Sequence, residues 1–488
     1  LFSIFLISFL ALGIRLYRID GYLTFLGDEG RDVRIVRNIL KGDPAFIGPQ
    51  TSIGNMYLGP LYYYMMAPFL WLSQLNPVGP AIMVALLGTI TITFTWWVGR
   101  TWFSPLTGLI AALLFSLSPV AIIYSRSSWN PNPMPFFALL GIWSIWHVWN
   151  HKKFHWLPLA GIALAFALQM HYLGLLLIPT FGLFWLFSLI SIWKNKSPQR
   201  LQFFRSTVYT ILIFALLMSP LLLFDLKHDW MNYNAFKEFF TNRQTTINLN
   251  PANSDRFLIV FYKMVDDLIL GTSHLYLSVS GIIFVSLSFF YLIRTSNHKK
   301  NYLLLFIWVL FAYLGLGVYK QHVYAHYFGF VLPAIYLLIS YLITRLLEGN
   351  SYFRLLGLFF LCSLIIIYLN NSPLKFTPNN QLQRTEQAVD QIIRHSNGKE
   401  FNFALIAKQN YEESYRYFFE NKSAQMFRGE DKITDQLFVI CEDGDSCQPE
   451  GHSHYQIAIF GIAHVVDEWR LDHLRIYKLV HSETVSSR

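Results

Sequence analysis

The chain has 488 residues, of which 54% are hydrophobic and only 14% are charged, and its mean hydropathy is +0.37. A soluble domain with an ordinary surface does not reach this value, so the composition predicts an α-helical protein that crosses a membrane several times. The formal net charge of +9 does not indicate a nucleic-acid partner, because Lys and Arg occur in small clusters between apolar segments, and we expect anionic lipid head groups instead.

About eleven apolar stretches approach the roughly 20 residues that a helix needs to cross the hydrocarbon core. In chain order they are residues 1–18, 79–99, 105–124, 133–149, 156–171, 173–193, 206–226, 275–293, 302–319, 327–346 and 352–370. The sequence begins at Leu1 inside the first stretch, so we expect a few preceding residues and no cleavable signal peptide.

The first long loop contains residues 25–43, FLGDEGRDVRIVRNILKGD, which predict an amphipathic helix. Val33, Val36, Ile39 and Leu40 fall on one helical face, and the other face carries Arg31, Arg34, Asn38 and Lys41. Asp28 and Glu29 stand at its start. Asp28 suits an N-cap and a catalytic group equally well, and the local sequence does not decide between these two roles.

Residues 59–74, GPLYYYMMAPFLWLSQ, are apolar but short, contain Pro68, and carry several Tyr and Trp residues. This composition predicts a helix that lies in the membrane interface. If this helix does not cross the membrane, all compact basic clusters of the short loops fall on the cytoplasmic side. This agrees with the enrichment of Lys and Arg in short cytoplasmic loops. The long first loop and the tail after residue 371 are then exterior.

Polar and ionisable side chains gather at the exterior ends of the predicted helices, where burial near lipid is costly unless the groups have a function. The candidates for holding an anionic group are Arg126, His171, His228, Lys320, His326 and Tyr327. Arg126 also suits a head-group anchor, and His171 a structural histidine. His322 and His326 have i, i+4 spacing, but no Glu completes a zinc motif, so no cofactor is certain and a divalent metal is left open.

One or two carboxylates among cations suit sugar transfer from a polyprenyl phosphate. The phosphate leaving group needs positive charge, and the acceptor hydroxyl needs a base, for which we predict Asp28 with Glu29 in support. Tyr62, Tyr63 and Asn130 are predicted to form a groove for the lipid and the acceptor. The alternatives are a transporter or flippase, or a polymerase, of lipid-linked saccharides, although the sequence shows no internal repeat.

Several segments resemble membrane glycosyltransferases of the protein O-mannosyltransferase and ArnT type, which have the GT-C fold. They are DEGRDVRIVRNIL, GPLYYYMMAPFLWL, the Ser-Arg loop, the Gln-Met-His-Tyr turn and HYFGFVLPAIYLL, in order over roughly residues 1–345. The resemblance implies a polyprenyl-phosphate-linked donor, inversion at the anomeric carbon, and Asp28 as the acidic residue of the first loop. It also implies interfacial helices in that loop, in agreement with the charge distribution. From the composition and the charge distribution we expect a multi-pass protein of the cell membrane whose site is on the exterior face.

The sequence departs from this family at two places. Many relatives have an acidic residue in the second exterior loop, where this chain has Asn130 and Asn132. Relatives often carry Lys in the short turn that here contains His171, so a phosphate contact at this position would depend on pH. The sequence does not identify the sugar, or whether the acceptor is a protein, a lipid or a glycan.

A small exterior α/β domain, residues 372–488, is predicted to follow the transmembrane domain of residues 1–371. In it TEQAVDQIIRHS and EESYRYFFE predict helices, while FNFALIA, QLFVIC, YQIAIFG and LRIYKLV predict strands. It has no glycine-rich phosphate loop, and we expect it to assist acceptor binding or packing. Cys441 and Cys447 allow one disulfide if the domain is exterior.

Overall fold

The computed structural model describes residues 2–51, 56–196, 198–241, 255–271, 298–442 and 447–482. The chain forms two compact units. The helical unit contains Leu1–Tyr17, Pro44–Leu72 and Gly79–Thr377, and the α/β unit contains Arg18–Asp43, Ser73–Val78 and Pro378–Arg488. The α/β unit therefore includes part of the first loop as well as the tail.

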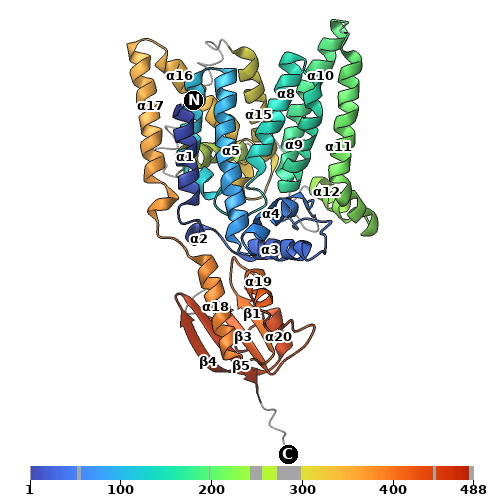
Figure 1. Ribbon diagram of the computed structural model, residues 1–488, viewed down its shortest axis with the longest axis vertical. Helices are drawn as coiled ribbons and strands as arrows, with labels where there is room; N and C mark the ends of the chain where they lie inside the picture. The colour runs from blue at the N-terminus through green and yellow to red at the C-terminus, as the bar shows by residue number, and fades with distance from the viewer. Residues whose placement is uncertain are drawn as a thin grey trace, which may run out of the picture. The chain divides into compact units, whose positions relative to one another are not determined.

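The helical unit is a bundle of mostly apolar helices (Figure 1). Its principal helices are α1 (Phe2–Leu16), α4 (Leu61–Leu72), α5 (Val78–Trp102), α6 (Pro105–Leu117), α7 (Pro119–Ile123), α8 (Met134–His151), α9 (Leu157–Met170), α10 (Leu177–Lys194), α11 (Arg200–Lys227), α12 (Met231–Thr241), α13 (Asp255–Lys263), α15 (Lys299–Val318), α16 (Leu332–Leu347) and α17 (Ser351–Asn370). Short helical turns are η1 (Phe154–Trp156), η2 (Tyr172–Leu176), the π-helical η4 (Met264–Leu270), η5 (Ala325–Phe328) and η6 (Pro373–Lys375).

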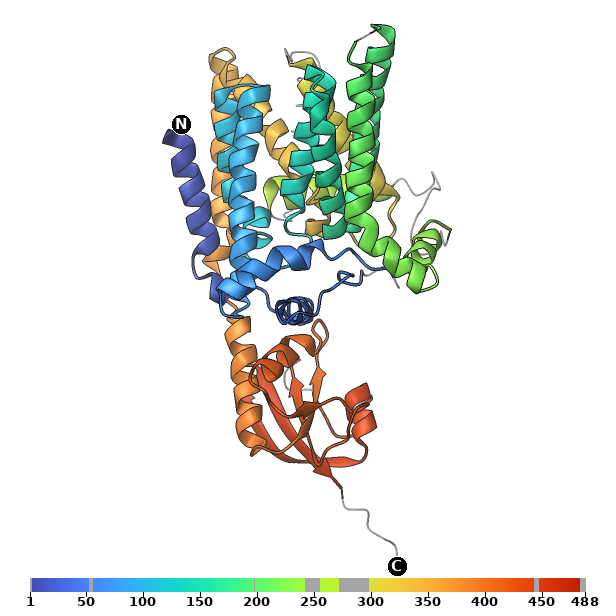
Figure 2. The same ribbon diagram turned by 45° about the vertical axis from the view of Figure 1, so that its right-hand side comes forward.

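The predicted spans coincide with these helices, except that residues 275–293 lie outside the described residues. Five described helices are long and apolar enough to cross a membrane: α5, η2 with α10, α11, α15 and α17. The shorter apolar helices are α1, α6, η1 with α9, and α16. The count of eleven spans stays a prediction. With only 12 residues, α4 is shorter than a spanning helix, and it lies across the bundle (Figure 2).

One end of the helical unit joins helix termini that carry basic residues. Asn301, at the start of α15, donates to the Trp102 carbonyl at 2.6 Å and accepts from Trp146 Nε1 at 2.8 Å. Lys300 Nζ donates to Asn150 Oδ1 at 3.2 Å. The connections from α10 to α11 and from α16 to α17 lie at the same end (Figures 1 and 2). Among the described residues, the basic loops that we predicted to share one side of the membrane thus share one end of the bundle.

The α/β unit is built on a five-stranded sheet of order β2-β1-β3-β5-β4. The strands are β1 (Phe401–Ile406), β2 (Met426–Phe427), β3 (Gln436–Cys441), β4 (Ala463–Leu471) and β5 (Leu474–His481). β1 pairs in parallel with β2 and β3, whereas β5 pairs antiparallel with β3 and β4. The helices are α2 (Ile19–Tyr22), α3 (Gly27–Leu40), α18 (Gln381–His395), α19 (Glu413–Asn421) and α20 (Tyr455–Phe460).

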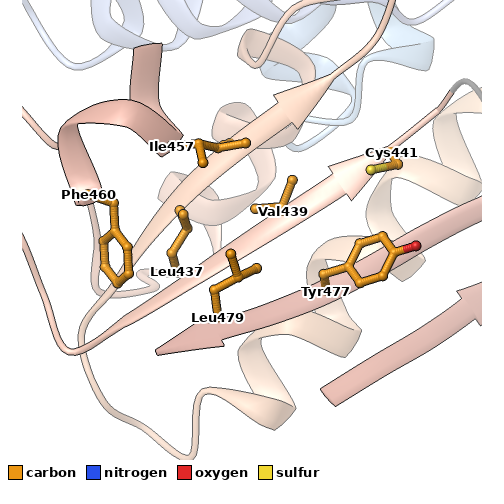
Figure 3. Packing of buried hydrophobic residues seen from close by; sticks show 8 residues of the cluster. Leu437, Val439, Cys441, Ile457, Phe460, Tyr477 and Leu479 are labelled. Carbon is orange, nitrogen blue, oxygen red and sulfur yellow. The ribbon is translucent and has the colours of Figure 1, made fainter. Parts of the chain in front are cut away.

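The predicted strand YQIAIFG is wrong, because residues 455–460 form helix α20. Ile457 and Phe460 are three residues apart and lie on one helical face, so both pack against Leu437 and Leu479 of the sheet (Figure 3). The other predicted strands and both predicted tail helices are present. A disulfide joins Cys441 to Cys447.

Candidate functional site

Helix α3 begins at Gly27, with Leu26 as its N-cap, so the suggestion that Asp28 caps the helix is wrong. The cap comes from Glu29, whose Oε2 accepts from the Leu26 backbone N–H at 3.0 Å. Glu29 is 6% exposed, and burial raises the pKa of its carboxyl to about 8. Asp28 is the second residue of the helix and has no capping role.

The Asp28 carboxylate is held through one oxygen. Its Oδ1 accepts from Arg31 Nη1 at 2.9 Å and from the Tyr411 hydroxyl at 2.7 Å. Arg31 is itself held by buried Asp32, whose Oδ1 accepts from Arg31 Nη2 at 2.8 Å. The Asp28 side chain is 42% exposed, and its Oδ2 has no hydrogen-bond partner among the described residues. Such a carboxylate is oriented and still open to a substrate.

In the helical unit, the segment between α7 and α8 is buried and hydrogen-bonded to neighbouring helices. Asn130 Nδ2 donates to the Met170 carbonyl at 2.6 Å, and Ser128 Oγ lies 2.7 Å from the Tyr62 hydroxyl. Tyr62 and Tyr63 are both fully buried. The exposed aromatic residues of α4 are Tyr64 and Trp71, so these side chains are the ones available to lipid.

An aromatic and imidazole cluster, here called the histidine cluster, brings several predicted residues together. Its members are Trp129, His171, Tyr172, His326 and Tyr327. The His326 ring centroid lies 4.4 Å from that of Trp129, 6.0 Å from that of His171 and 4.7 Å from that of Tyr327. The rings of His171 and Tyr327 are 5.1 Å apart. The loop after α7, the turn before α10 and η5 thus meet at one place.

Both histidines of this cluster are neutral near pH 7. Burial, with a smaller contribution from His326, lowers the pKa of His171 to about 3, and burial lowers that of His326 to about 4. His171 Nδ1 accepts from the Leu173 backbone N–H at 3.2 Å, which places the ring proton on Nε2. His171 would therefore meet a phosphate as a neutral hydrogen-bond donor, without adding positive charge.

The positive charge in this part of the helical unit comes from arginine. Arg126 is 3% exposed, and its Nη2 donates to the Tyr17 carbonyl. The sequence analysis did not select Arg15, which is 1% exposed and donates through Nη1 to the carbonyls of Ala11 and Ser116. The two guanidinium groups are close enough to repel each other, and Arg15 has no ion-pair partner among the described residues. An anion near them would be strongly stabilised.

Two predicted residues, His228 and Lys320, are not members of the histidine cluster. The exposed His228 stacks on Phe224 with ring centroids 4.0 Å apart, and its Nδ1 lies 2.8 Å from the Phe224 carbonyl. The half-buried Lys320 lies between α15 and η5. The neighbouring carboxylate of Asp225 accepts from the backbone N–H groups of Asn232 and Tyr233, so it stabilises the turn before α12.

Sequence analysis missed the acidic pair Asp266 and Asp267 in η4. Asp266 is 3% exposed, and its Oδ1 has no partner among the described residues. Burial raises the pKa of Asp267, which interacts electrostatically with Lys263 and Tyr124. The sequence feature that could have revealed them is an acidic pair inside the apolar stretch MVDDLIL. No group of three or more His, Cys, Asp and Glu side chains suited to a metal occurs among the described residues.

Comparison with known proteins shows one matching family profile and a shared fold. Residues 58–224 match the sequence profile of the dolichyl-phosphate-mannose-protein mannosyltransferase family. No protein of curated function matches the chain in sequence. The fold is similar to that of ArnT from Cupriavidus metallidurans bound to undecaprenyl phosphate, with a TM-score of 0.62 at 12% identity over 99% of each chain. The apo state of that protein gives 0.60 at 14% identity over 97% of each chain.

A second similar structure is the archaeal oligosaccharyltransferase AglB from Archaeoglobus fulgidus in complex with an inhibitory peptide and a dolichol-phosphate. Its TM-score is 0.55 at 11% identity, over 90% of this chain and 69% of that chain. The predicted resemblance to membrane glycosyltransferases of the GT-C type is therefore confirmed. Together with its long apolar helices, this fold makes the chain a multi-pass membrane protein.

Proposed function

We propose that this chain, which has the fold of GT-C membrane glycosyltransferases, transfers a sugar from a polyprenyl-phosphate-linked donor to an acceptor hydroxyl. The observation that carries the proposal is the likeness, over nearly the full length of both chains, to a structure of ArnT bound to undecaprenyl phosphate. The acceptor is a protein, a lipid or a glycan, and the reaction inverts the anomeric carbon.

Asp28 is the general base of this reaction. The acceptor oxygen attacks the anomeric carbon while its proton passes to Asp28, and the bond from that carbon to the phosphate oxygen breaks. The lipid phosphate leaves with the electron pair and needs no proton, because phosphate is a stable anion. The half-exposed carboxylate with one unpartnered oxygen supports this role.

Arg126 supplies the charge that holds the lipid phosphate. Its burial beside Arg15 supports this role, since a buried cationic pair gains most from a bound anion. His171, His326 and Tyr327 supply neutral hydrogen-bond donors. His228 and Lys320 are proposed to contact the donor as well. Tyr62, Tyr63 and Asn130 are buried, so we propose that they support the groove for lipid and acceptor from inside the bundle.

The reaction takes place at the exterior face of the cell membrane, with the α/β unit on that side. The basic helix termini at one end of the helical unit support a cytoplasmic position for that end. The disulfide between Cys441 and Cys447 supports an oxidising compartment for the tail.

Labelling of intact cells with a membrane-impermeant thiol reagent tests this orientation. In a Cys362→Ser background, Asn397→Cys should react in intact cells, because Asn397 is exposed in the α/β unit. The matched control, Lys153→Cys between α8 and α9, should react only after the membrane is permeabilised. The reverse pattern would overturn the exterior assignment.

The activity itself is tested with purified protein in nanodiscs and a panel of polyprenyl phosphate sugars. We expect one or a few donors to be consumed with release of the lipid phosphate. Mass analysis of glycans and lipids from cells that lack the protein would identify the sugar and the acceptor. A protein that consumes no donor of this class in the presence of a cell-envelope extract would contradict the proposal.

A further inference from the structure

Helix α3, which carries Asp28, is fixed against α19 by ion pairs. Arg34 Nη1 lies 2.8 Å from Glu413 Oε2, and Arg37 Nη1 donates to Asn421 Oδ1 at 2.8 Å. Arg37 also pairs with Glu420. Both helices belong to the α/β unit. The orientation of the candidate base is thus set by the tail of the chain, more than 370 residues away in sequence.

The two glycines that flank Asp28 and Glu29 permit a close approach of the segment that leads into α19 and of the start of that helix. A Cβ atom at Gly27 would lie 2.3 Å from the ring of Tyr411, and one at Gly30 would lie 2.3 Å from the backbone nitrogen of Ser414. Both distances are far inside van der Waals contact, so only glycine fits. The GDEG sequence is therefore adapted to contact with residues 411–414.

Tyr411 is held in place by its neighbour Asn410. The Asn410 Oδ1 accepts from the backbone N–H groups of Gly27 and Tyr411, both at 2.8 Å. Its Nδ2 donates to Glu442 Oε1 at 2.8 Å, just after β3. The same Glu442 oxygen accepts from the Tyr415 hydroxyl at 2.7 Å. This network ties the start of α3, the loop with Tyr411 and the sheet together.

The Tyr411 hydroxyl and Arg31 both donate to the same oxygen of Asp28. The distances to Oδ1 are 2.7 Å from the Tyr411 hydroxyl and 2.9 Å from Arg31 Nη1, and Arg31 Nη1 lies 3.2 Å from the Tyr411 hydroxyl. Two donors on one oxygen fix the plane of the carboxylate and leave Oδ2 as the atom available to a substrate.

We propose that Tyr411 is a positioning residue for sugar transfer: its hydroxyl orients Asp28 so that Oδ2 receives the proton of the acceptor hydroxyl. This inference rests on the proposed role of Asp28 as the base. It gives the α/β unit a direct part in the chemistry, beyond the acceptor binding or packing expected from the sequence. In the reaction, Tyr411 and Arg31 keep their contacts to Oδ1 while Oδ2 gains the proton.

The substitution Tyr411→Phe tests the proposal, because it removes only the hydroxyl and keeps the ring against Gly27. We expect kcat to fall about tenfold, the size of a lost hydrogen bond to a charged group, while KM for donor and acceptor stays unchanged. The matched control is Tyr417→Phe, which removes a hydroxyl that donates to the Leu75 carbonyl in the same unit without contact to Asp28. This control should keep the wild-type kcat.

A double-mutant cycle separates the proposal from its premise. If Tyr411 acts through Asp28, Tyr411→Phe should have no further effect on kcat in an Asp28→Asn background. An equal loss in both backgrounds would overturn the positioning role, as would wild-type kcat in Tyr411→Phe beside a strongly impaired Asp28→Asn. Full activity of Asp28→Asn would instead overturn the proposed base, and the positioning role with it. Tyr411→Leu provides a second variant, with melting measured for each protein.

Discussion

Two groups of candidate residues in this chain are held in opposite ways. Asp28, in the α/β unit, has a half-exposed carboxylate with one oxygen fixed and one without a partner among the described residues. The histidine cluster of the helical unit is packed, and its two imidazoles are kept neutral by burial. Under the proposed function, this difference predicts that the exposed group exchanges a proton and that the packed groups bind the donor without changing charge.

The largest expected effect is at Asp28. Asp28→Asn should lower kcat by a factor of about 10² to 10⁴, the usual cost of removing a general base, because the amide cannot accept the acceptor proton. The fold should be kept, since Leu26 and Glu29 provide the N-terminal cap and Asp28 does not. The measurement is steady-state transfer by purified protein, with melting as the control. A near-normal kcat in Asp28→Asn would show that Asp28 does not accept the proton, and Asp28 and the histidine cluster would then not differ in this role.

A smaller loss is expected at Arg126. Arg126→Ala should weaken use of the donor by roughly ten- to a hundredfold, because a charge-assisted contact to phosphate is worth about 1.5–3 kcal/mol. Arg126→Lys should be milder, since it keeps the charge but not the planar donor geometry. The readout is kcat/KM for the donor beside expression and melting. Equal values in wild type and Arg126→Ala would exclude Arg126 from phosphate binding.

The histidine cluster should be less sensitive still. His171→Gln should retain activity within about tenfold, because an amide replaces one neutral donor by another. Since the pKa of His171 is about 3, its charge does not change between pH 5 and pH 8, and the shape of the pH–rate profile over this range should be the same in both proteins. An inflection of the wild-type profile near pH 6.5 that His171→Gln abolishes would show that the imidazole titrates.

Glu29 should affect stability more than rate. Its pKa is raised by burial from 4.5 to about 8, so between these values the folded protein retains a proton that the unfolded chain has lost. Stability should therefore be full below about pH 4.5 and should decrease as the pH rises towards 8. Glu29→Gln keeps an acceptor for the Leu26 N–H and removes this dependence, which thermal unfolding at pH 5 and pH 8 would measure. The same decrease in stability in wild type and in Glu29→Gln would contradict the assignment of this pH dependence to Glu29.

Much of the helical unit could be predicted from sequence, because a long apolar stretch between charged loops fits few structures other than a spanning helix. Short segments were harder to predict. Residues 455–460 fit a strand and a helix equally well by period, and only packing of Ile457 and Phe460 against the sheet decides between them. The inclusion of α3 in the α/β unit depends on pairs such as Arg34 with Glu413, which no local pattern reveals.

The site was predictable to a similar degree. Asp28 was found because an acidic pair after an apolar stretch is conspicuous, and His171 and His326 because they interrupt apolar segments. Tyr411 was missed, since a tyrosine in a polar tail carries no signal until the structure places its hydroxyl 2.7 Å from Asp28. Arg15 was not selected, because a single arginine in an apolar stretch does not reveal its neighbours, and its burial beside Arg126 became visible only in the packed bundle.

The most direct test of sugar transfer by this chain measures the products of a single reaction in nanodiscs. Wild-type protein is mixed with a polyprenyl phosphate sugar and the acceptor, and lipid phosphate and the anomeric configuration of the product are followed together by mass spectrometry and NMR. We expect one lipid phosphate to be released for each sugar transferred, with inversion, and a loss of both in Asp28→Asn. Movement of the intact donor across the bilayer without release of lipid phosphate would contradict it and favour a flippase.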